Sequence, residues 1–356
     1  MFPFVSIVIP AYNAGSTIIP LLSSIYHSQK ADLASIEVIV VDDHSLDNTI
    51  DLINKFILNH PKLEIKILKL GKNKGPAHAR NAGAKAAGIG KREAGSMKKH
   101  VIFFLDSDVV LHKKSLYELM RSFEDPDIHA LTGVWDKKQR SHDFFPKFKA
   151  LRDWSYWINE RDPKHYYYLF STRVAAIDRG LFMRLGGFDE TYKAALVEDI
   201  ELTYRIARRY AVVFNPKVTV YHEFELFWPI AKKYFWRSYY WSKIYRERKK
   251  FDPVATTNKE ALTTVSAGAI AGLGVLSIVL GIMYYVLGIK LENFVFIKYL
   301  IINAFLLILL IHLLGVRKFL WFCYKEEGIV FALKAFITGF ILYLVILSGA
   351  GLSMFS

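Results

Sequence analysis

Three long apolar stretches near the end of the chain most constrain what it can fold into. They cover residues 261–289, 294–316 and 329–352. Each exceeds the roughly 20 apolar residues that cross a bilayer as a helix. Lys298 and Lys334 lie near the ends of these stretches, where an ammonium group can reach the lipid headgroups. We expect three transmembrane helices within residues 256–356, because three such segments in succession disfavour buried helices of a soluble protein.

Basic residues set the expected orientation of these helices. The segment "KKYFWRSYYWSKIYRERKK" precedes the first stretch, and "RKFLWFCYKEE" joins the second to the third. Both belong on the cytoplasmic side by the positive-inside rule. We therefore expect a cytoplasmic N-terminal region and a C-terminus on the opposite side. The opening "MFPFVSIVIP" lacks a basic segment, so we expect no secretory leader. The single cysteine, Cys323, excludes an intrachain disulfide.

Residues 226–255 interleave aromatic and basic side chains directly before the first apolar stretch. Such a segment is also typical of nucleic-acid binding, and the chain carries a formal net charge of +14. Its place beside a membrane span favours a helix that lies on anionic headgroups instead. We expect an interfacial helix here and no nucleic-acid partner.

The first 225 residues read as alternating strands and helices. "VSIVIPAYN", "IEVIVVDD", "LEIKILKL" and "KHVIFFLDSD" are short apolar runs, and segments with helical spacing follow the first three. Strands that are apolar on both faces and alternate with helices predict a mostly parallel, Rossmann-like α/β sheet. In such sheets, ligands bind beyond the carboxyl ends of the strands.

Polar residues gather where these predicted strands end. They are Tyr12 and Asn13, Asp42 and Asp43, and Asp106 and Asp108. A single aspartate at a strand end is commonly just a helix cap. The pair in "FFLDSDVVL" is more informative, because carboxylates seldom follow a buried strand without a partner. Spacing by one residue lets both carboxylates of a turning loop face one crevice.

The chain resembles the family 2 glycosyltransferases of the GT-A fold from about Val5 to Glu223. The matching segments are "VSIVIPAYNAGSTI", "VIVVDDHSLDNT", "NKGPAHARNAGA", "FFLDSDVVL" and "LGGFDETYKAALVEDIELTYRI". The resemblance implies a cytosolic GT-A domain of residues 1–225, a UDP- or GDP-sugar donor, and Mn²⁺ or Mg²⁺. It also implies that Arg80 lies near the diphosphate and that Asp43 contacts the base or ribose. The implied nucleotide-sugar site comprises Pro10, Tyr12, Asn13, Asp42, Asp43, Gly75, Arg80, Asn81 and Asp106.

The same resemblance assigns the metal and the base. Asp108 would bind the metal, with Asp106 on the ribose or on a metal-bound water, and His222 would join the metal shell. The pair Glu198 and Asp199 begins a predicted helix, where acids also simply complement the helix dipole. In the family this pair supplies the general base, and Asp199 is the candidate, with Glu198 as its orienting partner or substitute.

The resemblance leaves the acceptor open. Residues 146–170 border the acceptor in this fold, and Trp154, Tyr156 and Trp157 would either stack on a sugar or belong to the core. We expect inverting transfer to a hydroxyl of a membrane lipid or lipid-linked acceptor at the cytoplasmic face. A polyprenyl-phosphate acceptor is the alternative, and a non-catalytic sugar-nucleotide-binding protein is the alternative of another class. The family's polymer-extruding synthases carry a Q-x-x-R-W motif near residue 235, which this chain lacks.

Overall fold

The computed structural model describes residues 2–89, 99–160, 168–191, 197–248, 257–286 and 294–355. The chain divides into two compact units, residues 1–224 and 225–356. The second unit contains both the segment expected to be an interfacial helix and the long apolar helices.

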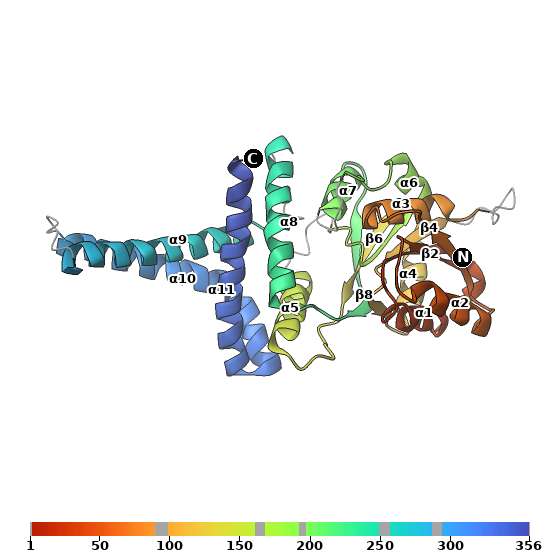
Figure 1. Cartoon of the computed structure of the whole chain (residues 1–356), viewed down its shortest axis with the longest axis horizontal. Helices are drawn as coiled ribbons and strands as arrows, with labels where there is room; N and C mark the ends of the chain where they lie inside the picture. Colours follow the sequence, from red (N-terminus) through yellow and green to blue (C-terminus); the bar gives the residue numbers. More distant parts are fainter. Residues whose placement is uncertain are drawn as a thin grey trace. The chain divides into compact units, whose positions relative to one another are not determined.

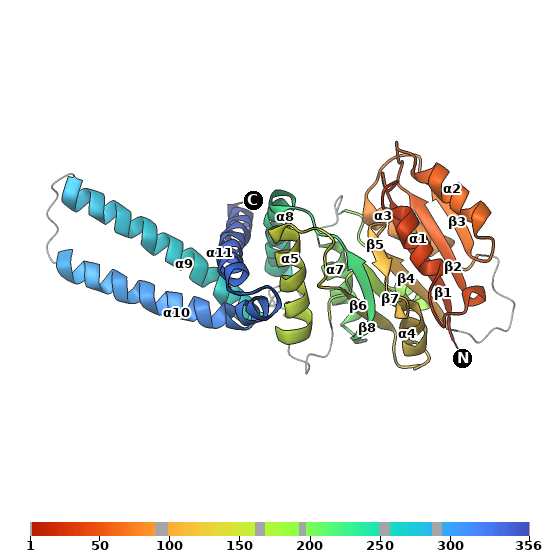
Figure 2. The same cartoon turned by 90° about the horizontal axis from the view of Figure 1, so that it is seen from below.

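The first unit is built on a twisted sheet, drawn in Figures 1 and 2. Its described strands lie in the order β3-β2-β1-β4-β7-β6-β8-β5. Their bounds are β1 Phe4–Ala11, β2 Ile36–Asp42, β3 Glu64–Lys69, β4 His100–Leu105, β5 Val109–Leu111, β6 Ala130–Trp135, β7 Val174–Asp178 and β8 Val212–His222. β5 and β7 run antiparallel to the strands beside them, and the other pairings among the described strands are parallel. The mostly parallel α/β sheet predicted from the sequence is therefore confirmed.

Helices cover both faces of this sheet. They are α1 Ile18–Tyr26, α2 Thr49–Asn59, α3 Pro76–Ala86, α4 Ser115–Ser122, α5 Phe144–Ser155, α6 Arg179–Arg184 and α7 Glu198–Ile206. Short turns of other helix types cover Leu33–Ser35 and Tyr156–Glu160. Side chains of α1, α2 and α4 share one buried cluster, and those of α3, α6 and α7 share the other. Figure 1 shows these two sets on opposite sides of the strands.

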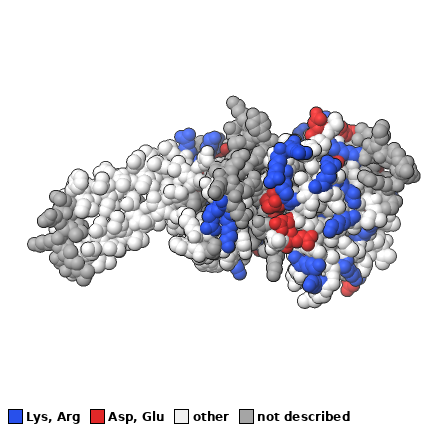
Figure 3. Space-filling model, turned by 90° about the horizontal axis from the view of Figure 1, so that it is seen from above, with Lys and Arg blue, Asp and Glu red and all other residues white. Residues whose placement is uncertain are grey.

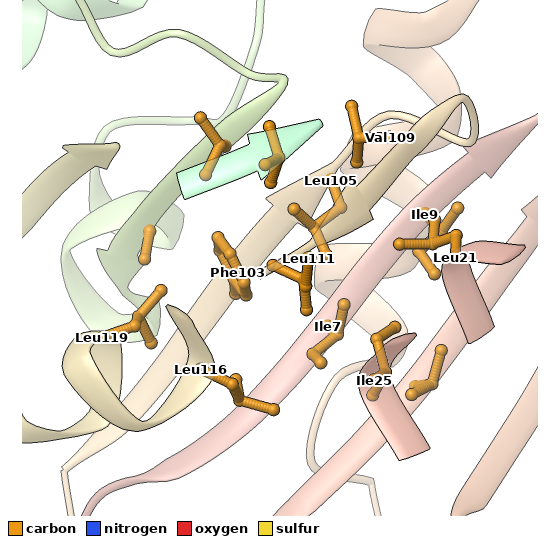
Figure 4. Packing of buried hydrophobic residues seen from close by; sticks show 14 of the residues in the cluster. Ile7, Ile9, Leu21, Ile25, Phe103, Leu105, Val109, Leu111, Leu116 and Leu119 are labelled. Atoms are coloured by element: carbon orange, nitrogen blue, oxygen red, sulfur yellow. The ribbon is translucent and has the colours of Figure 1, made fainter. Parts of the chain in front are cut away.

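The strands fill both clusters because their side chains alternate between the faces. Phe103 and Leu105 of β4 enter the first cluster, whereas Ile102 and Phe104 enter the second. Figure 4 shows Phe103 and Leu105 among apolar residues of β1, β5, α1 and α4. The apolar run before the two aspartates is therefore the centre of the core, and the chain reaches a polar environment only where β4 ends.

The second unit consists of α8 Phe227–Arg248, α9 Asn258–Gly281, α10 Phe294–Glu327 and α11 Ile329–Leu352, with short turns at Ile282–Val286 and Ser353–Phe355. Three helical segments in the described residues are long and apolar enough to cross a membrane: Asn258–Val286, Val295–Glu327 and Ile329–Phe355. Many of their large apolar side chains are exposed, as suits contact with lipid. Figure 3 shows one extended part of the surface almost free of charge.

The segment "RKFLWFCYKEE" differs from the sequence-based expectation. We expected a connection after residue 316, but α10 continues to Glu327, and Gly328 alone separates it from α11. No glycine or proline interrupts residues 316–327, whereas Gly328 has a φ of 85°, which favours glycine. A helix of 34 residues is about 50 Å long. The hydrocarbon layer is only about 30 Å thick, so the basic end of α10 has room to extend beyond it.

A buried histidine links two of the apolar helices. Nδ1 of His312 in α10 lies 3.0 Å from Oγ of Ser266 and 3.2 Å from the backbone oxygen of Thr263, both in α9. A Cβ at Gly315 would come within 2.3 Å of the Thr263 hydroxyl. The absence of a side chain at Gly315 therefore permits the close approach of these helices, and His312 supplies a polar contact between them.

Candidate active site

The predicted site residues of the first unit converge on one edge of the sheet. Ala11 at the end of β1 pairs with Asp42 at the end of β2, and β4 lies on the other side of β1. The loops that follow these three parallel strands therefore leave the sheet side by side. They carry Tyr12, Asp43 and Asp106.

The loops after β1 and β2 are hydrogen-bonded to each other. Asn13, with a φ of 50°, accepts a hydrogen bond at Oδ1 from the Leu46 backbone N–H at 2.9 Å. Its own N–H donates to the Ser45 hydroxyl at 2.9 Å. Tyr12 stays about half exposed, and Pro10 is a partly buried residue of β1. In this arrangement Asn13 shapes the loop, and Tyr12 is the side chain that remains accessible to a ligand.

Asp43 fastens the next loop. Its two carboxylate oxygens accept from the backbone N–H groups of Lys74 and Gly75, at 2.9 and 2.8 Å. Gly75 precedes α3 with a φ of 89°, a conformation that suits glycine. The adjacent carboxylate of Asp42 accepts from the Ser45 N–H at 3.2 Å. Both aspartates are buried, so they fix the shape of the edge at which a nucleotide is predicted to bind.

Arg80 of α3 connects two motifs that are far apart in the sequence. Its Nη2 lies 2.7 Å from Oδ1 of Asp106, and its Nη1 lies 3.1 Å from Oε1 of Glu198. The arginine side chain is almost fully buried. Burial acts to lower the pKa of the guanidinium, but the charges of Asp106, Glu198 and Asp199 outweigh this effect, so the pKa lies above its ordinary value. Arg80 holds the first aspartate of "DSD" to the first residue of α7.

Asn81 holds a different loop. Its amide forms two hydrogen bonds with the backbone of Phe188, donating to the carbonyl and accepting from the N–H, both at 2.8 Å. It also donates to Oε1 of Glu190 at 2.8 Å. Gly187 has a φ of 74°, and a Cβ there would lie 2.5 Å from Oδ1 of Asn81. In this structure Asn81 supports the "GGFDE" loop.

Asp108 and His222 meet because of the pairing between β5 and β8. Val109 pairs with His222, which places His222 next to the preceding Asp108, and Nε2 of the imidazole lies 3.5 Å from Oδ2 of the carboxylate. About half of the Asp108 side chain is exposed. Desolvation by the surrounding protein raises the pKa of this carboxyl. The hydrogen bond and charge of His222, together with the charge of Arg173, outweigh it, so the pKa lies below its ordinary value.

The remaining members of the predicted site begin α7. Glu198 and Asp199 are both buried, and Oδ1 of Asp199 accepts from the Ile200 N–H at 2.8 Å. Within the described residues, no group of three or more His, Cys, Asp or Glu side chains is arranged to hold a metal. The potential metal ligands that the structure brings together are therefore the pair Asp108 and His222, with Asp106 bonded to Arg80.

The predicted acceptor aromatics divide between buried and partly buried positions. Trp157 is buried and stacks on Tyr168, with ring centroids 5.8 Å apart. Trp154 and Tyr156 are partly buried and pack against the same cluster. Trp157 thus belongs to the core, which was one of the two interpretations of this segment. Residues 161–167 of the predicted acceptor region lie outside the described residues.

Comparison with known proteins identifies the family. The family model for glycosyl transferase family 2 matches residues 6–186, about half of the chain. The chain belongs to glycosyltransferase family 2. It is 34% identical over 134 residues to the poly(ribitol-phosphate) β-N-acetylglucosaminyltransferase TarP of Staphylococcus aureus, covering 37% of this chain and 36% of that protein. It is 25% identical over 243 residues to the probable glycosyltransferase YdaM of Bacillus subtilis, covering 66% and 53%.

A solved structure shares the fold of this family 2 glycosyltransferase. The mannosyltransferase PcManGT from Pyrobaculum calidifontis, in complex with GDP-Man and Mn²⁺, has a TM-score of 0.61 at 17% identity. The match covers 99% of this chain and 88% of that one. The chain spans only about a quarter to a half of the length of the curated relatives it matches. The comparisons therefore establish membership of glycosyltransferase family 2 and a GT-A fold.

Three further residues of this glycosyltransferase lie at the same edge, and sequence reasoning did not select them. Arg173 directly precedes β7, whose first residue Val174 pairs with Leu105. Gln139 accepts from the Phe224 N–H at 2.9 Å and donates to the His222 backbone oxygen at 2.8 Å, so it fixes the strand end that carries His222. Lys149 of α5 is buried. A search for charged residues at the starts of antiparallel strands would have found Arg173. No such sequence signal marks Gln139 or Lys149.

Proposed function

We propose that this protein is an inverting, metal-dependent glycosyltransferase. It moves a sugar from a nucleotide-diphosphate sugar to a hydroxyl of a membrane lipid or lipid-linked acceptor at the cytoplasmic face. The observation that carries the proposal is the Arg80 bridge from Asp106 to Glu198. This bridge supports a single site in which the motif predicted to hold metal and the motif predicted to supply the base act together.

The donor atoms present fit a divalent ion. Asp108 supplies a partly exposed carboxylate, and His222 supplies an imidazole whose Nε2 faces it. The other ring nitrogen of His222 is buried and has no hydrogen-bond partner among the described residues. Imidazole suits manganese better than magnesium. When bound, the ion would neutralise charge on the donor diphosphate as the leaving group departs. Asp108, His222 and Asp106 are the residues that would hold it.

We assign removal of the acceptor's hydroxyl proton to Glu198 and Asp199 at the start of α7. A hydroxyl acceptor must lose its proton as it attacks, and a positioned carboxylate can accept it. Asp199 is the proposed base. Glu198 is the proposed orienting residue, because its ion pair with Arg80 fixes the first turn of α7 relative to the "DSD" loop. The buried positions of both carboxylates favour a fixed geometry over free rotation.

The proposed donor class rests on family membership and on the relatives. TarP is a β-N-acetylglucosaminyltransferase by name, and PcManGT was solved with GDP-Man and Mn²⁺. These are properties of those proteins. For this chain they support a UDP- or GDP-sugar as donor and a divalent metal as cofactor.

The second unit supports a membrane acceptor. Its three long apolar helices suit a bilayer, and α8 exposes large aromatic side chains, among them Trp228, Trp236 and Tyr245. Lysines and arginines alternate with these aromatics along α8. Aromatic and basic side chains on one helix suit the level of anionic headgroups. We propose that α8 lies on the cytoplasmic membrane surface, where a lipid-borne acceptor presents its headgroup.

The proposed function is tested with the purified full chain in detergent. The protein is incubated with a panel of UDP- and GDP-sugars, a membrane lipid extract and Mn²⁺, and the products are identified by mass spectrometry. We expect one glycosylated lipid that disappears in excess chelator and in Asp108→Ala. Its sugar should survive mild acid, because a glycoside on a hydroxyl is stable where a glycosyl phosphate is cleaved.

Two other results would change the assignment. An acid-labile product on polyprenyl phosphate, formed by Asp199→Asn almost as fast as by the unaltered chain, would replace the hydroxyl acceptor by a phosphate. Metal-dependent nucleotide binding without transfer or donor hydrolysis, for every donor in the panel, would leave a non-catalytic binding protein.

A further inference from the structure

Arg173 is a cation at the site edge for which the proposed reaction gives no role. It lies between Thr172 and the first residue of β7, next to the end of β4 and its "DSD" loop. Its guanidinium carbon lies 5.1 Å from the ring centroid of Trp135 and 5.6 Å from that of Phe224. Among the described residues, no carboxylate lies within ion-pair distance of Arg173.

A second cation lies against the same ring. Nζ of Lys149 is 4.9 Å from the Phe224 centroid, and the amine also pairs with Asp153 one helical turn further along α5. Burial lowers the pKa of Lys149, the charge of Asp153 opposes this, and the nearby charge of Arg173 lowers the pKa further. Two cations therefore flank one aromatic ring, and Asp153 pairs with one of them, Lys149. In this cluster of Arg173, Lys149 and Phe224, Arg173 is the cation that has no carboxylate at ion-pair distance among the described residues, so its guanidinium donors are the ones that an anion could engage.

The sheet order separates this cluster from the predicted nucleotide site. The nucleotide motifs follow β1, β2 and β3, on one side of β4. Arg173 precedes β7, Trp135 ends β6 and Phe224 follows β8, which all lie on the other side of β4. Asp108 and His222 lie close to the cluster, because Phe224 is two residues beyond His222 and His222 is beside Asp108. An anion at the cluster would therefore lie on the side of β4 away from the predicted nucleotide motifs, next to the proposed metal ligands.

We propose that Arg173 and Lys149 bind a phosphate group of the acceptor. The role as acceptor site rests on the proposed function, whereas phosphate binding itself does not. Arginine and lysine are suited to phosphate because guanidinium and ammonium groups donate charge-assisted hydrogen bonds to its oxygens. The phosphate belongs either to a terminal monoester or to a phosphodiester within a lipid headgroup. In both cases it would hold the acceptor on the side of β4 away from the predicted nucleotide motifs.

The test measures binding by calorimetry to the full chain in a neutral detergent, in the presence of chelator so that no metal can recruit phosphate. Citronellyl phosphate is the monoester probe, dihexanoyl phosphatidylglycerol is the phosphodiester probe, and citronellol is the uncharged control. The variants are Arg173→Gln and Arg173→Lys. Arg179→Gln is the matched control, because Arg179 is a partly exposed arginine directly beyond the other end of β7.

We expect at least one phosphate probe to bind more tightly than citronellol. Arg173→Gln should weaken the binding of that phosphate probe by about tenfold or more, the scale of one charged hydrogen bond. Arg173→Lys should lose less affinity for the probe than Arg173→Gln, and Arg179→Gln should bind the probe as tightly as the unaltered chain. The preferred probe identifies the kind of ester. Lys149→Met should act in the same direction, but the Arg173 variants carry the test because Lys149 is buried.

Two results would overturn the proposal. One is equal binding of both phosphate probes by Arg173→Gln and the unaltered chain. The other is that Arg173→Gln loses as much affinity for UDP and GDP in Mg²⁺ as it loses for the phosphate probe. That result would place Arg173 at the donor diphosphate. Donor hydrolysis is measured separately. Failure to use any nucleotide sugar, with Arg173-dependent phosphate binding intact, would refute the proposed reaction and leave the phosphate site standing.

Discussion

Replacing Arg80 by methionine should destabilise the first unit strongly. Methionine fills much of the space but leaves Asp106 and Glu198 without the guanidinium that lies 2.7 and 3.1 Å from them. Removing one partner of a buried ion pair costs about 3–5 kcal/mol. Glu198 accounts for most of this cost because it is nearly fully buried, whereas about a quarter of the Asp106 side chain is exposed to water.

The effect is measurable as a melting temperature. For a unit of this size, 1 kcal/mol corresponds to about 2–4 °C, so the loss should be roughly 6–20 °C. The assay is thermal unfolding of the full chain in one detergent, followed by tryptophan fluorescence. Arg209→Met is the control, since Arg209 is exposed in the turn after α7 and should shift the midpoint little.

A double variant isolates the charge effect. Arg80→Met combined with Glu198→Gln should melt above Arg80→Met alone, because the buried carboxylate is no longer charged. A fall of less than about 3 °C in Arg80→Met, or a double variant that loses the sum of the two single effects, would refute the reasoning.

Four further outcomes are expected. Asp108→Ala should lose transfer and metal-dependent nucleotide binding together; full activity of this variant, or of the unaltered chain in excess chelator, would contradict the metal assignment. Asp199→Asn should keep nucleotide affinity but lower turnover by about 10²-fold or more; a loss confined to donor affinity, measured by calorimetry, would exclude the base role. Protease added to sealed vesicles with the cytoplasmic side inside should spare the N-terminal unit and reach a tag fused after residue 356, and the reverse pattern would invert the topology. Burial, opposed by Asp153, lowers the pKa of Lys149 from 10.5 to about 8. Between those pH values Lys149 is deprotonated in the folded chain but still protonated in the unfolded chain. The unfolding free energy should therefore rise with pH across this window, by up to about 3 kcal/mol relative to Lys149→Met. Equal pH profiles of the melting temperatures would show that Lys149 titrates normally.

The sequence predicted the strands whose ends carry polar residues, because a β-branched apolar run followed by Asp or Asn is a local signal. It did not predict the role of the antiparallel strand β7. A search for ligands at the carboxyl ends of strands passes over Arg173, which lies at a strand start. Only the pairing of Val174 with Leu105 brings that start to the same edge. Register between distant segments is a property of the whole sheet, and no local pattern encodes it.

The length of α10 shows a similar limit. Hydropathy falls at Arg317 and Lys318, so a span predicted from apolar content ends there. Helical hydrogen bonding does not depend on apolar content, and nothing in residues 316–327 breaks it. The chain therefore stays helical until Gly328 adopts its positive φ. Apolar patterning locates a membrane segment, whereas backbone chemistry sets where the helix ends.

Arg80 shows why the individual site residues were harder to place than the motifs. The resemblance put this arginine near a diphosphate, but its donors are bonded to Asp106 and Glu198, which lie 26 and 118 residues away in the sequence. The neighbouring Asn81 is bonded to the "GGFDE" loop, and Gly75 at the start of the same helix is bonded to Asp43. The segment formed by α3 and the residue before it thus contacts Asp43, Asp106, Glu190 and Glu198. We expect its polar residues to act on the reaction by fixing the positions of the segments that they contact, so a change in any of them should alter donor binding and turnover together.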